Sequence, residues 1–434
     1  MSGQAPVRVV ILGGGFAGLN AAVALERALP RGREVEITLV NRDNFILFTP
    51  MLHEVAASDL DLTHIVTPIR RMVRRTVLFV GTVEEIDLPG RRVVVRHAGG
   101  AHEHELEYDH LVLALGSVTN FFGLPGLEER ALTMKSLADA IALRNRLIEV
   151  LEEADFECAG PERHRLLTIL VAGGGFAGVE TIAAANDFLR EAVAAYPRLS
   201  ADQLRLVLVH PGETILPELA PKLGAYAARE LSRRGIEIRL GTRVTAVSED
   251  GVTLSDGTSV PAGTVVWTAG TAPNPLLAEL PCRMQRGRVV ADECLRVPEW
   301  PGVWALGDCA QVPDGAGGFH PPTAQHALRQ GRAVGRNIAA TVEGRDARPF
   351  VFSTLGQLAA IGRRTGVASI LGRNFAGFFA WWLWRSIYLS KLPGLDRKVR
   401  VALDWTLDLL FEKDLVQFRA ERSATREPAE AATA

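Results

Sequence analysis

Two stretches of the chain share one pattern of apolar and polar positions. Each begins with an apolar run, VRVVIL from Val7 and LTILVA from Leu167, passes through glycines and continues into a helix-forming run. Short apolar runs that stop at glycine are typical of buried strands. The pattern therefore predicts two strand–turn–helix units, which begin 160 residues apart.

The C-terminal part of the chain shows a different pattern. Ten apolar residues run from Phe375 to Trp384 and stop at Arg385. As a helix they would span about 15 Å, about half of a bilayer core. After a break at Pro393 and Gly394, the spacing predicts an amphipathic helix. Its charged side holds Arg397, Arg400, Asp404, Asp408 and Glu412, and its apolar side holds Ala402, Leu403, Leu409 and Leu410.

The glycines of both strand–turn–helix units have the spacing G-x-G-x-x-G, and the hexapeptide GGGFAG is identical in the two copies. In this motif the first glycine permits the tight turn, and the second lets the backbone approach a pyrophosphate. The third allows the helix to pack closely on the strand, and the helix N-terminus faces the phosphates. A single copy would be weak evidence, but two copies after buried-type strands predict two dinucleotide sites.

A second strand follows each glycine loop, and its end normally carries an acidic residue that binds the ribose. Here EVEITLV ends at Asn41, with Arg42 behind it, and LRLVLV ends at His210. Neither end is acidic, so the ribose contacts are less firmly specified than the phosphate loops. The second end, HPGET, also lacks the arginine that a 2′-phosphate needs, which favours NADH and leaves NADPH open.

Composition and charge exclude several classes of function. The formal net charge of −2 gives no overall reason to expect a nucleic-acid partner. The four cysteines are scattered without metal-ligand spacing, so we expect reduced thiols, no metal site and a cytoplasmic protein. The N-terminal apolar run is interrupted by Arg8, which argues against a secretion signal. No apolar run reaches the roughly 18 residues that a membrane span needs.

Taken in order, these features resemble the flavoprotein oxidoreductases that bind FAD in a first unit and NAD(P)H in a second. LVLALGS at 111–117 and VVWTAGTAPN at 265–274 look like the crossings between their two domains. GVWALGDCA at 302–310 looks like their second flavin motif, whose aspartate, here Asp308, would hold the FAD ribityl chain.

The resemblance implies an α/β fold with two Rossmann-like dinucleotide-binding domains. The NAD(P)H domain interrupts the FAD domain, and a C-terminal amphipathic helical region for membrane association follows. We expect the FAD domain at 1–124 and 275–345, the NAD(P)H domain at 125–274, the membrane-association region at 346–420 and a disordered tail at 421–434.

Within that superfamily the missing cysteines narrow the choice of family. The disulfide reductases carry a C-x4-C pair soon after the second strand, where this chain reads NFILFTPMLHEVAASDL. FTPMLHEVAAS instead resembles the corresponding loop of the type II, non-pumping NADH:quinone oxidoreductases. PPTAQHALRQG at 321–331 is similar to their A-Q-x-A-x-Q-Q quinone motif, with Arg329 in place of the first paired glutamine. WRSIYLSKLPG, which contains Lys391, resembles their C-terminal segment.

The resemblance implies FAD-dependent oxidation of NADH with two-electron reduction of a membrane quinone, without proton pumping. It implies catalytic positions for Glu180 beside the nicotinamide, with a further role in relaying a proton toward the quinone, and for Gln325 and Lys391 near the quinone. His326 and Cys309 are expected to be structural. The residues expected to contact cofactor or quinone are Gly13, Gly15, Phe16, Ala17, Gly18, Asn41, Arg42, Pro50, Val83, Gly116, Gly173, Gly175, Gly178, Glu180, His210, Gly270, Asp308, Ala324 and Gln325.

The C-terminal pattern suits an enzyme whose substrate lies in lipid. Trp381, Trp382 and Trp384 are expected to be exposed in a row, and tryptophan favours the headgroup level of a bilayer. Nearby basic residues would be attracted to an anionic lipid surface. These are Arg385, Lys391, Arg397, Lys398 and Arg400. We expect monotopic attachment at the cytoplasmic face of the cell membrane, with packing on the protein itself or in a homodimer left open.

Three alternative functions remain open from the sequence. A sulfide:quinone oxidoreductase would share the fold but needs reactive cysteines, and Cys158 and Cys309 lie in no convincing motif. A soluble NAD(P)H oxidase or ferredoxin reductase would not need the C-terminal segment. A flavin-bearing signalling protein would bind NADH with negligible turnover of any quinone.

Overall fold

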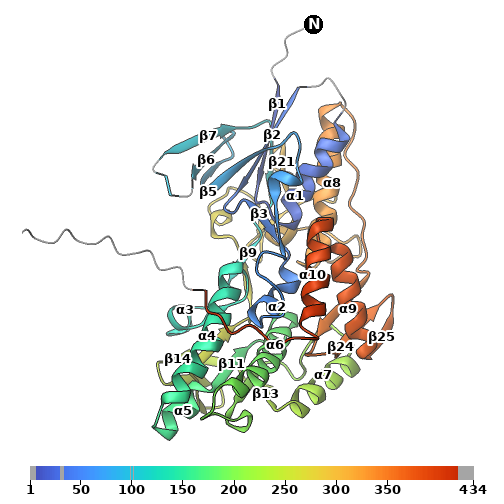
Figure 1. The fold of residues 1–434 in the computed structure, drawn as a ribbon. Helices are drawn as coiled ribbons and strands as arrows, with labels where there is room; N and C mark the ends of the chain where they lie inside the picture. The colour runs from blue at the N-terminus through green and yellow to red at the C-terminus, as the bar shows by residue number, and fades with distance from the viewer. Residues whose placement is uncertain (1–5, 30–33, 98, 101, 419–434) are drawn as a thin grey trace, which may run out of the picture.

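The structure is a computed structural model that describes residues 6–29, 34–97, 99–100 and 102–418. The tail expected at 421–434 lies outside these residues, as do the last two positions of the expected membrane-association region. Two large sheets form the two halves of the molecule, and the C-terminal helices lie beside the junction between them (Figure 1).

The upper sheet in Figure 1 is built from distant parts of the sequence. Its strand order is β21-β8-β1-β2-β5-β6-β7, and the first five of these strands run parallel. The strands are β1 (Val7–Leu12), β2 (Val35–Asn41), β5 (Val77–Asp87), β6 (Arg92–His97), β7 (Glu103–Glu107), β8 (His110–Leu113) and β21 (Val303–Ala305). Because β21 completes a sheet that β1 begins, a second sheet can be inserted between them.

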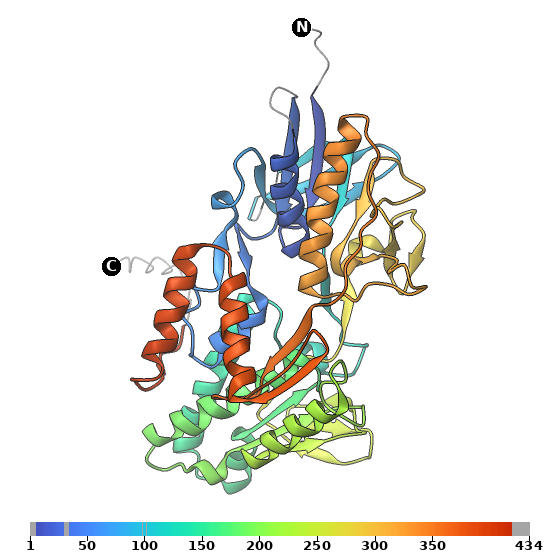
Figure 2. The ribbon, with the colours of Figure 1, turned by 90° about the vertical axis from the view of Figure 1, so that its right-hand side faces the viewer.

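Helices α1 (Phe16–Ala28) and α8 (Ala324–Val342) lie side by side against this upper sheet (Figure 2). A Cβ on Gly331 would lie 2.1 Å from the carbonyl oxygen of Ala17, and one on Gly335 would lie 2.5 Å from that of Ala21. Glycine at these two positions lets the helices approach closely. This packing holds the start of α8 near the first glycine loop.

The inserted chain folds into an all-parallel sheet of order β10-β17-β11-β12-β13. The strands are β10 (Leu132–Thr133), β11 (Thr168–Ala172), β12 (Arg205–Val209), β13 (Ile236–Arg239) and β17 (Thr264–Trp267). Helices α4 (Leu137–Phe156), α6 (Phe176–Ala192) and α7 (Pro221–Arg233) pack against it. A reciprocal cap starts α4, in which Ser136 Oγ accepts from the Asp139 amide and Asp139 accepts from the Ser136 amide.

Two short antiparallel strands connect the halves, β9 (Ser117–Thr119) and β18 (Thr271–Pro273). They are the two crossings predicted from the sequence. Each follows a glycine with a left-handed backbone, Gly116 at φ +69° and Gly270 at φ +96°. The predicted α/β architecture, with one dinucleotide-binding unit inserted in another, is confirmed. The exact boundaries at 124, 274 and 345 stay a prediction.

Short elements complete the chain, and α2 (Leu52–Ala56) is the one that matters most for the site. It packs against α4 and α6, and its Glu54 contacts Trp405 in the last helix of the described residues. The other short elements are β3 (Phe45–Leu47), β4 (Val66–Pro68), α3 (Leu127–Arg130), α5 (Gly160–Leu166), β14 (Val244–Val247), β15 (Gly251–Leu254), β16 (Ser259–Pro261), β19 (Met284–Gln285), β20 (Arg288–Val290) and β22 (Ala310–Gln311).

The C-terminal region is part sheet and part helix. Strands β23 (Gly356–Ala360), β24 (Gly366–Ile370) and β25 (Arg373–Gly377) form an antiparallel sheet that the sequence analysis did not predict. Helices α9 (Phe378–Lys391) and α10 (Leu395–Leu407) follow it. The prediction of one apolar helical run from Phe375 is wrong, because Phe375 lies in β25 and Gly377, at φ +77°, turns the chain into α9.

The three tryptophans of α9 have different surroundings. Trp382 is 51% exposed, whereas Trp384 is completely buried. Trp381 stacks on the guanidinium of Arg385, whose central carbon lies 4.3 Å from the ring centroid. The expectation of three exposed tryptophans in a row is wrong, because two residues of helix turn the side chain through more than half a circle.

The expected basic cluster also reaches the surface only in part. Arg385 lies between the rings of Trp381 and Trp405 and 3.7 Å from a carboxylate oxygen of Glu54. Arg397 is mostly covered beside Asp396. Apolar side chains dominate the exposed surface of these helices instead. Those at least half exposed are Phe378, Phe379, Trp382, Leu395, Val399, Leu403 and Leu407. Within the described part of the chain, no helix combines the length and apolar character that crossing a membrane requires.

Candidate functional site

The first glycine loop joins β1 to α1 and contains two kinds of glycine. Gly13 has φ +100°, and a Cβ there would lie 2.3 Å from the carbonyl oxygen of Ala114. A Cβ on Gly18 would lie 1.9 Å from the carbonyl oxygen of Gly13. The fold therefore requires these two glycines. A Cβ on Gly15 would meet no protein atom within 4 Å. Folding does not explain this glycine, but a dinucleotide pyrophosphate at the N-terminus of α1 does.

The second glycine loop repeats this arrangement between β11 and α6. Gly173 has φ +117°, and a Cβ on Gly178 would lie 1.8 Å from the carbonyl oxygen of Gly173. The nearest atom to a Cβ on Gly175 would be a carboxylate oxygen of Glu218 at 3.8 Å. Neither α1 nor α6 has an acidic residue in its first turn, which leaves the positive end of each helix dipole available to an anion. Both loops thus fit a dinucleotide.

Asn41 and His210, at the ends of β2 and β12, hold the two loops in the same way. Asn41 Oδ1 accepts a hydrogen bond from the Gly14 amide at 2.7 Å, and His210 Nδ1 accepts one from the Gly174 amide at 3.1 Å. Burial lowers the pKa of His210, which keeps this nitrogen an acceptor near neutral pH. Both side chains are engaged with the loop backbone, and their contact with a ribose stays a prediction.

Asp308, expected to hold the flavin ribityl chain, lies in the turn Gly307–Cys309. Its Oδ2 accepts a hydrogen bond from Ser117 Oγ at 2.8 Å, and Ser117 Oγ accepts one from Lys135 Nζ at 2.6 Å. Burial lowers the pKa of Lys135, and the charge of Asp308 opposes this. The network ties the expected flavin ligand to the crossing strand β9 and to the inserted unit.

The four cysteines are unpaired in the structure. All four are free thiols, of which Cys158 is exposed and Cys309 is buried. Burial raises the pKa of the Cys309 thiol to about 11, and its Sγ lies 3.2 Å from the carbonyl oxygens of Leu113 and Leu306. A protonated, buried thiol is a poor nucleophile. Cys309 is therefore a packing residue of the Asp308 turn, as expected.

A buried carboxylate, Glu180, lies where the two halves meet the C-terminal region. It accepts hydrogen bonds from the Trp384 indole N–H and from the Ala360 amide, each at 3.0 Å. Nδ1 of His53 lies 3.8 Å from its other oxygen. Burial raises the pKa of Glu180 to about 8. Near neutral pH this side chain therefore carries a proton on a carboxyl oxygen.

A second buried carboxylate, Glu54, follows His53 on α2. It accepts a hydrogen bond from the Trp405 indole N–H at 3.2 Å. Burial raises the pKa of Glu54 to about 8, and the attraction of Arg385 opposes this rise. Burial also lowers the pKa of His53 to about 3, so its imidazole is neutral. The side chains of His53, Glu54, Glu180, Trp384 and Trp405 are called the carboxylate cluster below.

The quinone-motif residues begin α8. Gln325 Nε2 donates to the carbonyl oxygen of Gly356 at 3.2 Å. Arg329, which replaces the motif's glutamine, donates to the carbonyl oxygen of Gln325 at 2.9 Å and stacks on Phe352, 4.1 Å from the ring centroid. Burial and the charge of Arg329 lower the pKa of Lys391 on α9. The structure thus brings Gln325, Arg329 and Lys391 into one region.

Two other polar residues of α8 are structural. Gln330 is buried, and its Oε1 accepts a hydrogen bond from the Gly307 amide at 2.8 Å. This bond fixes the turn that carries Asp308. His326 Nδ1 lies 2.7 Å from Thr323 Oγ1, and burial lowers the pKa of His326 to about 4. His326 is therefore neutral at physiological pH, in line with the expectation of a structural histidine.

The remaining expected contacts surround the first glycine loop and its neighbours. Phe16 and Ala17 begin α1, and the Phe16 ring meets the Phe48 ring edge to face with centroids 6.0 Å apart. Phe48 makes a similar contact with Tyr388 of α9 at 6.1 Å. Pro50 lies in the turn Thr49–Met51, Val83 in β5 and Ala324 at the start of α8, while Arg42 is exposed beside Asp43. Their contacts with cofactor or quinone stay a prediction.

The Trp384→Phe variant should lose about 1–3 kcal/mol of unfolding free energy, because it leaves Glu180 without its indole donor. The matched Trp382→Phe variant should change stability by less than about 0.5 kcal/mol, since that ring is half exposed. Chemical denaturation of both variants beside the parent protein measures the difference. Equal losses would contradict the placement of Trp384 in the carboxylate cluster.

Comparison with known proteins decides between the functions that the sequence left open. A family model described as pyridine nucleotide-disulphide oxidoreductase matches residues 7–331, and one described as NDH2 C-terminal domain matches residues 355–414. The type II NADH:quinone oxidoreductase Ndh of Mycobacterium tuberculosis is 34% identical over 93% of this chain and 88% of its own length. The chain belongs to the type II NADH:quinone oxidoreductase family. A relative from Staphylococcus aureus with the same description is 29% identical over 85% of this chain and 91% of its own length.

The fold of this chain is also that of a solved structure. The NDH2 of Plasmodium falciparum, solved in complex with NADH, matches with a TM-score of 0.88 over 95% of this chain and 100% of that chain. At 18% identity this match shows the fold alone. Although the first family model is named for disulphide chemistry, the four free cysteines show that this chain carries no disulfide.

Sequence analysis missed His53 and Glu54 as candidate site residues. Both stand in FTPMLHEVAAS, a stretch that is otherwise mostly apolar, and two adjacent titratable residues in such a stretch are a signal of buried polar groups. Their partners could not be found this way, because Trp405 lies 351 residues after Glu54.

Proposed function

We propose that this chain oxidises NADH with FAD bound at the first glycine loop and reduces a membrane quinone by two electrons, without pumping protons. The observation that carries the proposal is its kinship with type II NADH:quinone oxidoreductases over almost the whole chain. In each of the two glycine loops, the fold itself does not require the middle glycine of the motif. This observation supports two dinucleotide sites. The absence of a cysteine pair supports direct delivery of electrons to the acceptor.

The residues of the two loops bind and orient the dinucleotides in this proposal. The backbone amides at the starts of α1 and α6 donate to the pyrophosphates. Asp308, oriented by Ser117 and Lys135, accepts hydrogen bonds from ribityl hydroxyls. When bound, FAD supplies the two-electron redox chemistry between NADH and the quinone.

Glu180 and Lys391 supply protons in this proposal, since reduction of a quinone to a quinol takes up two protons. Glu180 holds a proton near neutral pH because burial raises its pKa to about 8. Lys391 is an acid whose pKa is lowered toward neutrality by burial and by Arg329. Gln325 offers an amide that can hydrogen-bond a quinone oxygen in exchange for its contact with Gly356.

The loop after β12 favours NADH over NADPH. His210 stands where the ribose is expected, and Glu213 and Glu218 follow it within eight residues. Glu218 lies beside the position of a Cβ on Gly175. Negative charge at this strand end opposes a 2′-phosphate, and no arginine of the HPGET stretch offsets it.

The function is tested by anaerobic reduction of the purified flavoprotein with NADH and, separately, with NADPH, followed by a soluble quinone analogue. NADH should bleach the flavin faster than NADPH, and the quinone should restore the colour with steady turnover. If NADH bleaches the flavin but only oxygen restores it, a soluble oxidase replaces the proposed function. If sulfide bleaches it and NADH does not, the sulfide:quinone alternative is correct.

We further propose that the protein attaches to the cytoplasmic face of the cell membrane without spanning it. The support is the exposed apolar surface of α9 and α10, described above, on the same helices as Lys391 and Arg400. Apolar side chains at a membrane interface gain from burial, and nearby cations gain from an anionic lipid surface. The attachment brings Gln325 and Lys391 close to a substrate dissolved in lipid.

A Phe379→Ser, Trp382→Ser double variant should bind lipid vesicles on the order of 100-fold more weakly, because two large apolar side chains are lost from the interface. The control pair Val77→Ser, Phe156→Ser removes exposed apolar groups elsewhere and should bind normally. Vesicle co-sedimentation measures both. If neither parent nor variants sediment and the double variant instead dissociates a dimer in solution, this surface is a homodimer interface.

A further inference from the structure

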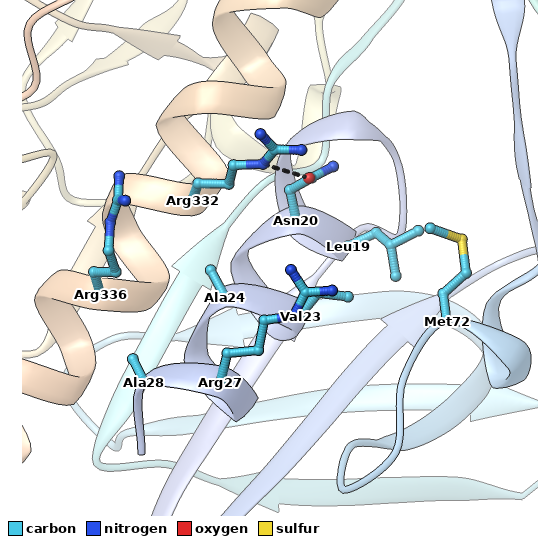
Figure 3. A pocket seen from close by; sticks show the side chains of 9 residues that line it. All are labelled: Leu19, Asn20, Val23, Ala24, Arg27, Ala28, Met72, Arg332 and Arg336. Carbon is cyan, nitrogen blue, oxygen red and sulfur yellow. Dashed lines mark hydrogen bonds between the residues drawn. The ribbon is translucent and has the colours of Figure 1, made fainter. Parts of the chain in front are cut away.

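A groove of about 510 Å³ lies on the upper half of the molecule, between α1 and α8, and its lining runs along α1 from Leu19, which directly follows the first glycine loop, to Ala28. Figure 3 shows three arginines around it, Arg27 from α1 and Arg332 and Arg336 from α8. Between them the groove is apolar, with Leu19, Val23, Ala24 and Met72 among its lining residues. The groove therefore combines an apolar floor with a strongly cationic rim.

The positive charge of this rim is not neutralised by neighbouring carboxylates. Among the described residues, none of the three arginines forms an ion pair, and the Arg332 side chain donates only to the neutral amide of Asn20, at 3.2 Å. Helix α8 contains no acidic residue. The one acidic residue of α1, Glu26, accepts hydrogen bonds from the backbone amides of Arg74, Arg75 and Thr76 instead.

The rim also continues toward the proposed quinone region. Arg329, Arg332 and Arg336 are spaced by three and four residues, which places them along one face of α8. The charge of Arg332 contributes to lowering the pKa of Arg329, and Arg329 does the same to Lys391 on α9. A cationic ridge therefore runs from Lys391, at the C-terminal end of α9, to the groove.

We propose that this groove binds the phosphate of an anionic phospholipid, with the apolar floor receiving the start of an acyl chain. Guanidinium groups pair with phosphate oxygens through two parallel hydrogen bonds, which suits arginine better than lysine for this role. The floor contains no aromatic ring on which a nucleobase could stack. This inference rests on the proposed membrane attachment and adds a specific headgroup site at a second place on the same protein.

The test compares the holoenzyme with an Arg27→Gln, Arg332→Gln, Arg336→Gln variant on phosphatidylcholine vesicles with and without phosphatidylglycerol. A control variant, Arg130→Gln, Arg243→Gln, Arg286→Gln, removes the same charge from exposed positions elsewhere. Binding to the anionic vesicles should fall on the order of 100-fold in the groove variant, and much less in the control. Turnover of NADH with a soluble quinone analogue should be unchanged in both.

Four outcomes would overturn the proposal. Equal losses in the two variants would mean general electrostatic attraction rather than a site. Phenylglyoxal modifies accessible arginines. If inorganic phosphate protects the three arginines from it as fully as anionic vesicles do, the groove binds a free anion rather than a lipid headgroup. Unchanged binding of the groove variant to anionic vesicles would refute the headgroup site alone and leave attachment through α9 and α10 intact. Absence of binding to any vesicle, with soluble turnover intact, would refute membrane attachment but not the enzymatic function.

Discussion

The Gly175→Val variant is expected to fold, to purify with its flavin bound, and to lose reduction by NADH. A Cβ at this position would lie no closer than 3.8 Å to any protein atom, so the chain itself accommodates a side chain. The added atoms would fill the space through which a pyrophosphate approaches the start of α6. Losing two hydrogen bonds to a charged group, at about 1.5–3 kcal/mol each, should raise the NADH concentration for half-maximal reduction by about 100-fold or more.

Anaerobic stopped-flow reduction of the flavin measures this effect directly. Dithionite should reduce the variant as it reduces the parent protein, and the quinone analogue should reoxidise it normally, because the first loop is untouched. The matched Gly15→Val variant should instead purify without FAD. A reversed pattern, in which Gly15→Val keeps FAD and loses only the response to NADH, would show that the two loops had been assigned in the wrong order.

A third substitution separates binding glycines from folding glycines. A Cβ on Gly178 would lie 1.8 Å from the carbonyl oxygen of Gly173, which is a backbone atom that cannot move aside. Gly178→Ala should therefore reduce the yield of folded protein, whereas Gly175→Val should not. This contrast shows why identical hexapeptides are such strong sequence signals. Some of their glycines are required by the fold and others are explained only by a ligand.

The parts of the site that the sequence predicted are those in which local backbone geometry and function coincide. The glycine loops, the crossings at Gly116 and Gly270, and the Asp308 turn each occupy a few consecutive residues whose conformation constrains their identity. The strand ends were harder to interpret. The side chains of Asn41 and His210 each accept a hydrogen bond from a backbone amide of a glycine loop. No sequence rule anticipated this contact, because the two residues differ in type and have only the acceptor atom in common.

The carboxylate cluster was hidden because it is assembled from four elements that are far apart in the chain. Glu180 lies on α6 and Glu54 on α2, while their indole donors come from α9 and α10. An apolar run containing Trp384 looks the same in sequence whether it faces lipid or a buried carboxylate. The residue at which the helix begins decides which way the Trp384 side chain points. The helix begins where β25 ends, and the end of β25 is set by its pairing with β24 rather than by the helix itself.

Glu180→Gln is expected to flatten the dependence of stability on pH. Burial raises the pKa of Glu180 to about 8 in the folded protein, whereas an exposed glutamate ionises near pH ~4.3 in the unfolded chain. The contribution of this group to stability is therefore fully present below the unfolded value and is lost as the pH rises toward about 8. The parent holoenzyme should lose on the order of 2–4 kcal/mol through this group over that range, and the variant should not.

Thermal melting of the holoenzymes at several pH values across this window measures the difference, with Glu128→Gln on α3, an exposed position, as the control. The parent and the control should lose melting temperature together as the pH rises, while Glu180→Gln should lose less. Parallel curves for all three proteins would mean that Glu180 is not held protonated in the fold.

The same substitution separates the two halves of the catalytic cycle. A glutamine oxygen still accepts hydrogen bonds from Trp384 and Ala360, so the carboxylate cluster keeps its shape. The amide cannot give up a proton, however. Reduction of the flavin by NADH should stay within about twofold of the parent, and reoxidation by the quinone should slow about 100-fold, the usual effect of losing a general acid. If both steps keep their rates, the raised pKa of Glu180 is a consequence of burial alone, and the protons for the quinol must come through Lys391.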